Sequence, residues 1–479
     1  MRKLKIIPFL LLAGVLTNCG DDFLNPEPTS AISADTFYST ESELMNGVIN
    51  MYDGIQGVNA LNNTDSDLNH AIQVEYFVTE MRSDNTQTKS GAGEGEQVQF
   101  ENHIIKPTNS IVYDYYRSFY DILNRANIVL KNLGVASDAN RAKIEGEAKF
   151  VRAYAHFNLV RLFGDIPLAD EVITIDNTEK QFTRVPKAEV YNLIISDLET
   201  AVASLDNTYK NRASKAAAQA LLAKVYLTLG TNYLKAQQLC EAVMSSGFSL
   251  QSNFHDVFYT ENNSEIIFAI GYLSNPATES QGFSAEWLNS IGRSRGVNYV
   301  TNDAAAALDS KGGSRTTTSY RVDPAQTSQK QVAKYFPNGE DGGSTGVVFT
   351  LTPRAAGNDW IVLRYADVLL MHVEAIMAGG DSTSVPAALN SFQLIRNRAG
   401  LTTPVTSISK EELLDERRVE LAFENQRFFD LVRFGVAQEV LSAYSAANGG
   451  SFTSTDLLLP IPQREINLSQ GKMQQNPGY

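Results

Sequence analysis

Residues 413–435, with the sequence LLDERRVELAFENQRFFDLVRFG, place carboxylate, guanidinium and aromatic side chains close enough together for chemistry. Two facing carboxylates act as acid and base, or as acid and nucleophile, in glycoside hydrolases. On one continuous helix, one side would carry four charged and two aromatic residues: Glu416, Glu420, Phe423, Arg427, Asp430 and Phe434. The other side would be apolar, with Leu414, Leu421, Phe428 and Val432.

Buried ion pairs explain this stretch better than an active site does. A catalytic pair must face an open groove, whereas the neighbours of these charges are large apolar groups. Because an unpaired buried charge costs several kcal/mol, charges among such neighbours are expected to be paired. The stretch therefore predicts ion pairs that hold the fold together.

The rest of the sequence contains no catalytic or metal-binding constellation that we can recognise. The five histidines are scattered, and none has the spacing of a metal-binding motif: His70, His103, His156, His255 and His372. The glycine-rich stretch GAGEGE, residues 91–96, misplaces the third glycine of a dinucleotide fingerprint, and no strand leads into it. We therefore expect neither an enzyme nor a bound cofactor.

Helical periodicity dominates the elements that must position these residues. The pattern predicts helices over 41–55, 110–134, 142–164, 187–205, 215–230, 232–247, 364–380, 386–400 and 413–435. Small residues between them allow neighbouring helices to approach closely: Ala216, Ala217, Ala218, Ala220 and Ala223. These features predict a mainly α fold of helix pairs stacked as in a tetratricopeptide-like solenoid.

Two long segments interrupt the helical pattern, at about 56–108 and about 250–355. Gly, Ser, Thr, Asn and Asp are frequent in them, and one strand is predicted over 264–272. Long irregular segments on a regular scaffold are where binding usually resides. We call them the first and second insertions and expect the ligand site there.

The N-terminus has the pattern of a bacterial lipoprotein. Basic residues precede an apolar run, 6–16, whose eleven residues at about 1.5 Å of rise each are too short to cross a bilayer. The run ends at LTNC, which resembles a lipobox, so residues 1–18 are predicted to be a signal peptide and Cys19 to carry lipid. The polar residues 19–33 would form a tether, and 34–479 a single domain.

Charge and cysteine content exclude several other classes of protein. The formal charge is −14, and loss of the three basic residues before Cys19 makes it −14 − 3 = −17. Such a surface argues against binding nucleic acid and against docking on anionic lipid by charge. Cys240 is the second of only two cysteines, so the fold is expected to hold without a disulfide and to bury Cys240.

Six stretches are similar, in order and spacing, to motifs of the SusD/RagB-like outer-membrane lipoproteins. DDFLNPEPTS follows Cys19, and ERRVELAFENQRFFDLVRFG resembles the charged helix of that family. The ending LLLPIPQREINLSQGKMQQNPGY resembles the family's C-terminus. The other matching stretches are EAKFVRAYAHFNLVRLFGDIPL, WIVLRYADVLLMHVEAIM and LNSFQLIRNRAGL.

The resemblance implies four tetratricopeptide-like units with irregular excursions and little β-structure. It also implies a non-catalytic protein that is lipid-anchored in the outer membrane and faces the outside. Such a protein would form the lid of a SusC-like TonB-dependent transporter and would hand over a nutrient, usually an oligosaccharide. The charged motif residues would belong to the scaffold.

Candidate ligand residues come from the two insertions, because sugar rings pack on aromatic faces and bond to Asn, Asp and Arg. The second insertion offers Tyr272, Phe283, Trp287, Arg293, Arg295, Tyr299, Tyr320 and Arg321. The first offers His70, Tyr76, Arg82, Asp84 and Asn85. Trp287 lies in the polar stretch SAEWLNS and is predicted to be an exposed platform. We expect ligand contacts from Trp287, Tyr272, Arg293, Arg295, Tyr299, Tyr320, Tyr76 and Asn85.

Peptide capture is the alternative function, which some relatives perform. It would use loops that pair with a peptide backbone and a groove of complementary charge. A strongly negative surface suits basic peptides, whereas four arginines in the second insertion favour anionic sugars: Arg293, Arg295, Arg315 and Arg321.

Overall fold

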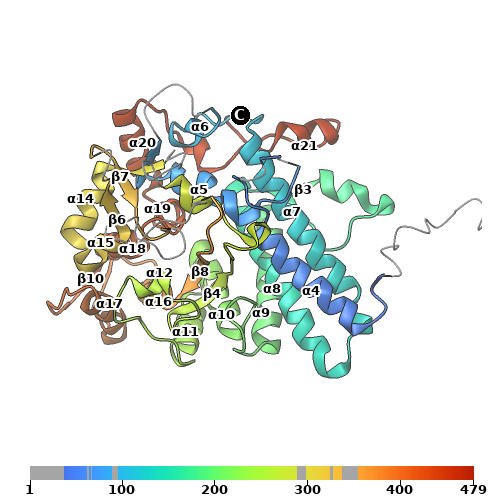
Figure 1. Ribbon diagram of the computed structural model, residues 1–479, viewed down its shortest axis with the longest axis horizontal. Coiled ribbons are helices and arrows are strands. Elements are labelled where there is room, and N and C mark those ends of the chain that lie inside the picture. The colour runs from blue at the N-terminus through green and yellow to red at the C-terminus, as the bar shows by residue number, and fades with distance from the viewer. Residues whose placement is uncertain are drawn as a thin grey trace, which may run out of the picture.

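The structure is a computed structural model (Figure 1), and it describes residues 37–61, 64–65, 67–88, 95–287, 298–323, 327–336 and 354–479. The predicted signal peptide, the tether with Cys19, and both Arg293 and Arg295 lie outside the described residues.

Eight helices of the described chain form the scaffold, and each packs on the next in chain order. They make four consecutive pairs: α4 (Glu41–Gln56) with α7 (Ser110–Lys131), α8 (Asp138–Phe163) with α9 (Lys187–Ser204), α10 (Lys215–Leu229) with α11 (Tyr233–Met244), and α16 (Tyr365–Met377) with α17 (Pro386–Arg398). Figure 1 shows α4, α7 and α8 on the right and α17 at the lower left. The predicted mainly α fold is confirmed.

Local sequence signals explain where these helices begin and end. Thr40 and Glu43 form a capping box at the start of α4, and the N–H of Gly57 bonds to the carbonyl of Asp53 at its end. The Asn109 side chain accepts from two backbone N–H groups in the first turn of α7, at 3.0 and 3.2 Å. In α10 the predicted close approach is confirmed, since Ala216, Ala217, Ala218, Ala220 and Ala223 are all buried.

The insertions contain short elements. The first has η1 (Ala71–Val74), α5 (Glu75–Val78), η2 (Glu80–Arg82), β1 (Thr86–Thr88) and α6 (Val98–Glu101). The second has α12 (Asp256–Tyr259), β4 (Ile266–Ile270), η5 (Ala277–Glu279), α13 (Phe283–Glu286), β5 (Asn298–Val300), α14 (Asn302–Lys311), η6 (Gly313–Arg315), α15 (Thr316–Ser319), β6 (Tyr320–Val322) and β7 (Lys330–Val332). The predicted strand over 264–272 is thus confirmed as β4.

Helix α14 was not predicted, because helical periodicity looked absent throughout the second insertion. Thr301 caps this helix by accepting from the N–H of Ala304 at 3.1 Å. The buried side of α14 consists mainly of small residues, Ala304 and Ala305 with Leu308. Alanines also lie next to the buried face of α14, so the buried and exposed sides differ little in hydrophobicity. The helical periodicity of the sequence is therefore weak.

All strands of the described chain pair in two-stranded antiparallel sheets, β1–β5, β2–β3, β4–β8, β6–β7 and β9–β10. The remaining strands are β2 (Ile166–Pro167), β3 (Arg184–Val185), β8 (Trp360–Arg364), β9 (Ser382–Thr383) and β10 (Ile408–Ser409). The β1–β5 pair joins the two insertions, with Thr86 opposite Val300. This pairing holds together segments that are more than two hundred residues apart.

The predicted single helix over 413–435 is wrong. The chain forms α18 (Lys410–Glu420) and α19 (Arg427–Arg433), separated by a turn in which Phe423 and Asn425 have positive φ, 64° and 58°. The turn brings the Glu424 carboxylate to the Arg364 guanidinium, at 2.7 Å, and to Lys334, at 2.6 Å. The chain continues through α20 (Ala437–Asn448), η8 (Ser454–Leu457) and α21 (Gln463–Leu468).

The charges in this region are paired in the interior, as predicted. Glu420 accepts from Arg364 at 2.6 Å, from Arg315 at 2.9 Å and from Arg398. Although burial favours the neutral acid, these three guanidinium groups hold the pKa of Glu420 well below its usual range. Asp430 accepts from Arg417 at 2.9 Å.

Candidate functional site

Trp287 is not the exposed platform that the sequence predicted, and this expectation is wrong. Its side chain is about 1% exposed. The indole lies 5.5 Å from the Tyr76 ring and 6.4 Å from the Phe423 ring, measured between ring centroids. Polar neighbours in the sequence indicated exposure, but the first insertion and the turn before α19 cover the indole.

Several other candidates hold elements of the fold together. Tyr299 is buried in β5, and the hydroxyl of Tyr320 donates to Asp309 at 2.7 Å. Asn85 is buried, donates to Glu80 at 3.1 Å and accepts from Arg418 at 2.9 Å. None of these three residues lines the insertion cleft or the concavity around Tyr272, both described below.

Two residues named beside Asn85 are also part of the scaffold. Asp84 forms an ion pair with Arg427 at 2.8 Å, and Arg82 donates to the carbonyl of Asp456 at 2.6 Å. The guanidinium of Arg82 also lies 4.1 Å from the centre of the Phe428 ring.

Tyr76, by contrast, lines a cleft of about 340 Å³, which we call the insertion cleft. Its walls come from both insertions and from the first turns of α7. The lining residues are Ala60, Leu61, Thr64, His70, Gln73, Val74, Tyr76, Phe77, Gly95, Glu96, Gln97, Ser110, Ile111, Asp114, Gly282, Phe283 and Glu286. Segments far apart in the sequence therefore meet at one concave surface, as the two-insertion hypothesis requires.

Hydrogen bonds between the segments fix the shape of the insertion cleft. Gln73 donates to the carbonyl of Ser280 at 3.1 Å and accepts from the N–H of Gly282 at 3.0 Å, which ties the first insertion to the second. The ring nitrogen Nδ1 of His70 lies 2.6 Å from Asp114 on α7. These bonds join the walls of the cleft to each other and to α7.

The N-terminus of α7 forms one edge of the cleft. Glu96 accepts from the backbone N–H of Ser110 at 2.8 Å, and from its hydroxyl. A carboxylate at this position is stabilised by the free N–H groups and the dipole of the helix. Glu96 therefore fixes the start of α7 against the first insertion.

The insertion cleft is acidic. Glu96, Asp114 and Glu286 line it, and its described lining contains neither lysine nor arginine. Burial raises the pKa of Asp114, and the hydrogen bond with His70 acts in the opposite direction. An anionic ligand would be repelled here, whereas hydroxyl groups would find hydrogen-bond acceptors.

The apolar part of the cleft consists of aromatic rings that are already packed. Tyr76 and Phe77 have ring centroids 4.0 Å apart, and Phe283 meets Trp360 edge to face at 5.3 Å. Each ring leaves only a small part of its surface to the cleft. Sequence reasoning named Tyr76, Phe283 and His70 but missed the polar residues that converge on them, because their approach depends on the fold.

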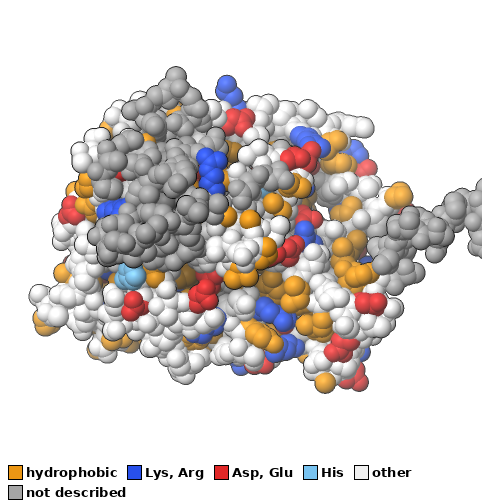
Figure 2. Space-filling view, viewed as in Figure 1, with side chains coloured by type: hydrophobic (Ala, Val, Ile, Leu, Met, Phe, Trp, Pro, Cys, Tyr) orange, Lys and Arg blue, Asp and Glu red, His pale blue; other side chains and the backbone are white. Residues whose placement is uncertain are grey.

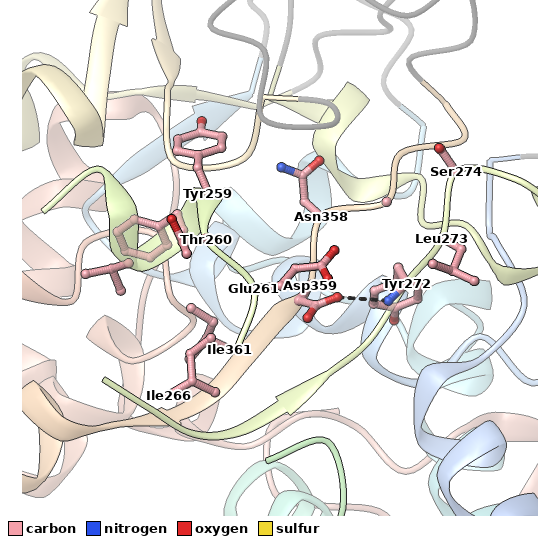
Figure 3. A pocket seen from close by; sticks show the side chains of 13 residues that line it. Tyr259, Thr260, Glu261, Ile266, Tyr272, Leu273, Ser274, Asn358, Asp359 and Ile361 are labelled. Atoms are coloured by element: carbon pink, nitrogen blue, oxygen red, sulfur yellow. Dashed lines mark hydrogen bonds between the residues drawn. The ribbon is translucent and has the colours of Figure 1, made fainter. Parts of the chain in front are cut away.

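Tyr272 lies in a second, smaller concavity of about 270 Å³ (Figure 3). Its backbone N–H donates to Asp359 at 3.0 Å, and its hydroxyl donates to the carbonyl of Gln56 at 2.8 Å. Burial raises the pKa of Asp359 to about 6, and the nearby Glu261 carboxylate adds to the shift. Its described lining comes from the second insertion and the start of β8, so the first insertion does not contribute.

Neither a membrane span nor a metal centre emerges from the described chain. No helix there is long and apolar enough to cross a membrane. The same residues contain no group of three or more His, Cys, Asp or Glu side chains that could hold a metal ion.

Known proteins resemble this chain along most of its length. SusD-like protein P2 of Formosa agariphila is 27% identical, and the alignment covers 100% of both chains. The starch-binding protein SusD of Bacteroides thetaiotaomicron is 26% identical over 76% of this chain and 78% of its own. The solved structure of a laminarin binding SusD-like protein matches with a TM-score of 0.76 and 25% identity, over 92% of this chain and 100% of the other.

Two family models match adjoining parts of the chain. The model described as "Starch-binding associating with outer membrane" matches residues 22–227, and the model described as "SusD family" matches residues 244–479. Together they account for both halves of the helical scaffold and for most of both insertions. The chain therefore belongs to the SusD/RagB-like family.

Proposed function

We propose that this protein captures a neutral oligosaccharide in the insertion cleft. The observation that carries the proposal is the cleft itself, in which both insertions combine aromatic rings with hydrogen-bonding side chains. Relatives named for starch and for laminarin binding support the same ligand class. Both of those polysaccharides are neutral glucans.

The chemistry of the lining suits hydroxyl-rich ligands. Carboxylates and amides at Glu96, Gln97 and Asp114 accept hydrogen bonds from sugar hydroxyls, and the small exposed parts of Tyr76 and Phe283 offer apolar surface to ring C–H groups. Because hydrogen bonds within the protein hold the walls of the cleft, binding should lose little conformational entropy in the protein.

The acidic lining favours a neutral ligand over an anionic one. The expectation of anionic sugars rested on four arginines, of which two belong to the fold. Arg315 pairs with Glu416 at 2.6 Å, and Arg321 lies 4.3 Å from the centre of the Phe336 ring. The other two arginines lie outside the described residues.

The place of capture in the cell is part of the proposal. We infer a protein lipidated at Cys19, anchored in the outer membrane and facing outward, which passes its oligosaccharide to a SusC-like TonB-dependent transporter. The family description "associating with outer membrane" supports this location. The protein would not change the sugar chemically, so incubation with an oligosaccharide should release no new reducing ends.

Calorimetry tests the proposal with laminarihexaose and maltohexaose as neutral probes, an oligouronate as the anionic probe and a lysine-rich peptide as the alternative ligand. Wild-type protein should bind at least one neutral probe and not the oligouronate. Thr64 is exposed and lines the cleft, so Thr64→Trp places an indole there and should weaken that binding by about tenfold or more. Thr403→Trp, at an exposed position elsewhere, is the matched control.

Binding of the peptide alone would favour the alternative, peptide capture. Binding of a neutral oligosaccharide with equal affinity by Thr64→Trp and Thr403→Trp would locate the site outside the insertion cleft.

A further inference from the structure

A third concavity lies next to the insertion cleft and has no role in the fold that we can identify. It has a volume of about 510 Å³, and we call it the Tyr113 groove. Its lining comes from the loop before α7, the start of α7 and the C-terminal helix α21: Pro107, Thr108, Asn109, Ser110, Tyr113, Pro462, Gln463, Arg464, Asn467 and Leu468.

The Tyr113 groove and the insertion cleft are continuous at the start of α7. Ser110 lines both concavities. Ile111 and Asp114 face the cleft, whereas Asn109 and Tyr113 face the groove. A helix rises about 1.5 Å per residue, so Ser110 and Tyr113 are separated by only about 4.5 Å along the axis. A linear ligand that leaves the cleft over Ser110 therefore enters the groove.

The groove offers exposed apolar surface. Leu468 is about 55% exposed at the end of α21, and Pro107, Pro462 and Tyr113 lie around it. Figure 2 shows hydrophobic side chains among acidic and basic ones over the region of α21. Apolar C–H faces of sugar rings pack on surfaces of this composition.

Polar groups in the groove are available to a ligand. The Tyr113 hydroxyl forms no hydrogen bond with another residue that the structure describes. The Arg464 guanidinium lies 4.9 Å from the centre of the Tyr113 ring and forms an exposed ion pair with Asp67 at 2.9 Å. Both groups can bond to sugar hydroxyls without breaking a buried contact.

The walls of the groove are held in place by the fold. The N–H of Gln463 donates to the carbonyl of Pro107 at 2.8 Å, which joins α21 to the loop before α7. The side chain of Asn109 caps α7 and donates to the carbonyl of Glu96 at 3.0 Å. A ligand therefore meets a preformed surface here as well.

We propose that the Tyr113 groove is a second subsite for the captured oligosaccharide. The chain leaves the insertion cleft across Ser110, and its distal sugar rings lie against Tyr113, Pro462 and Leu468. This inference rests on the proposed function of the insertion cleft and adds that the protein selects for chain length. Short oligosaccharides fill the cleft alone, whereas longer ones also contact the groove.

The test compares Tyr113→Ala with wild type by calorimetry, using the series from laminaribiose to laminarihexaose and the corresponding maltose series. Tyr113→Ala should lower the affinity for the hexasaccharide that wild type binds by about fivefold. Its affinity for the shortest measurable member of that series should be unchanged. Tyr209→Ala is the matched control, because Tyr209 is likewise a tyrosine beside an arginine, with the Arg212 guanidinium 4.7 Å from the centre of its ring. It should change neither affinity.

The outcomes separate this proposal from the previous one. Equal affinity of Tyr113→Ala and wild type at every length, or an equal loss at every length, would overturn the subsite and leave capture in the cleft intact. If wild type binds no oligosaccharide, both proposals fail. If Tyr113→Ala abolishes binding while Thr64→Trp preserves it, the groove is the sole site and the two-subsite arrangement is wrong.

Discussion

Glu420 illustrates how charge is used in this protein at the scale of single residues. Its carboxylate is fully buried and accepts from arginines on three segments, at positions 315, 364 and 398. Such a network is stable only while every member is present, because each remaining charge would be buried without its partner. The carboxylates that looked like chemistry in the sequence therefore join the end of α18 to the second insertion and to α17.

Loss of Glu420 should unfold the protein more readily. We expect Glu420→Ala to lower the free energy of unfolding by roughly 3–5 kcal/mol, measured by urea denaturation. Glu179→Ala is the control, because its ion pair with Lys472 is mostly exposed, and should lower it by less than about 1 kcal/mol. A variant that keeps its stability but loses its ligand would make Glu420 a binding residue.

Glu75 should make stability depend on pH. Burial raises its pKa from 4.5 to about 7, although Arg161 and Lys224 oppose the shift. The folded state thus holds the proton more tightly than the unfolded state does. The stabilisation is complete below pH 4.5 and is lost as the pH rises through about 7.

The variant Glu75→Gln removes this titration while keeping the shape of the side chain. The difference between its free energy of unfolding and that of wild type should shift by about 3 kcal/mol in favour of the variant as the pH rises from 4.5 to 8. Glu439→Gln, at an exposed position, should follow wild type throughout. Parallel curves for Glu75→Gln and wild type would contradict a raised pKa at Glu75.

Trp287 is expected to act through stability. Because the indole is buried against Tyr76 and Phe423, Trp287→Ala should lower the free energy of unfolding by about 3–5 kcal/mol. Thermal melting and urea denaturation measure this loss. Unchanged stability together with selective loss of oligosaccharide binding would instead support the prediction that Trp287 is an exposed platform for the ligand.

At the scale of elements, the end of α4 positions the insertion cleft. Gly57 has a φ of +69°, and a Cβ at this position would lie 2.4 Å from the carbonyl oxygen of His70. The next residue, Val58, donates its N–H to the carbonyl of Asn69 at 2.7 Å. The scaffold helix and the His70 wall of the cleft therefore touch through backbone atoms, which only glycine permits here.

Gly57→Ala should weaken both the fold and the cleft. Gly57 combines its positive φ with a ψ of 165°, a conformation that essentially only glycine adopts and that costs alanine about 1–3 kcal/mol. The clash with His70 should bring the loss to on the order of 3 kcal/mol or more. Gly247→Ala is the control for a positive φ without a clash, because its φ is +89° and a Cβ there would meet nothing within 4 Å. Equal melting temperatures for the two variants would show that the backbone at His70 can move away from the added Cβ at little energetic cost. We also expect weaker oligosaccharide binding for Gly57→Ala alone.

At the scale of the whole molecule, a continuous row of helices carries two insertions that meet each other. The β1–β5 pair and the Gln73 bonds join them directly. The hydrophobic core also includes residues of both, such as Phe77 and Phe283, together with Phe119 of α7. The insertion cleft and the scaffold therefore share one core, so cleft geometry and global stability should change together.

The predicted anchor should be separable from this body. Cys19→Ala should abolish incorporation of labelled palmitate and release the protein from the outer-membrane fraction. The released protein should melt at the wild-type temperature and bind the same oligosaccharide, because residues 19–33 are predicted to form a tether outside the domain. Labelled wild-type protein is the reference, and absence of label there would refute lipidation.

The sequence by itself determined the features that depend on neighbours along the chain. Helical periodicity and caps, such as Thr40 with Glu43, act within a few residues, so the scaffold helices were predicted correctly. The mixture of charge with large apolar groups after residue 413 likewise predicted buried ion pairs, because an unpaired charge cannot stay in a core. Composition also predicted two insertions, at about 56–108 and about 250–355.

Only the tertiary structure decided which side chains face the insertion cleft. Trp287 looked exposed because its sequence neighbours are polar, but Tyr76 and Phe423, each more than a hundred residues away in the sequence, cover it. The break between α18 and α19 likewise follows from Glu424 reaching Arg364 and Lys334. Burial and ion pairing depend on contacts between distant segments. A local sequence pattern does not specify which distant segment will pack against it.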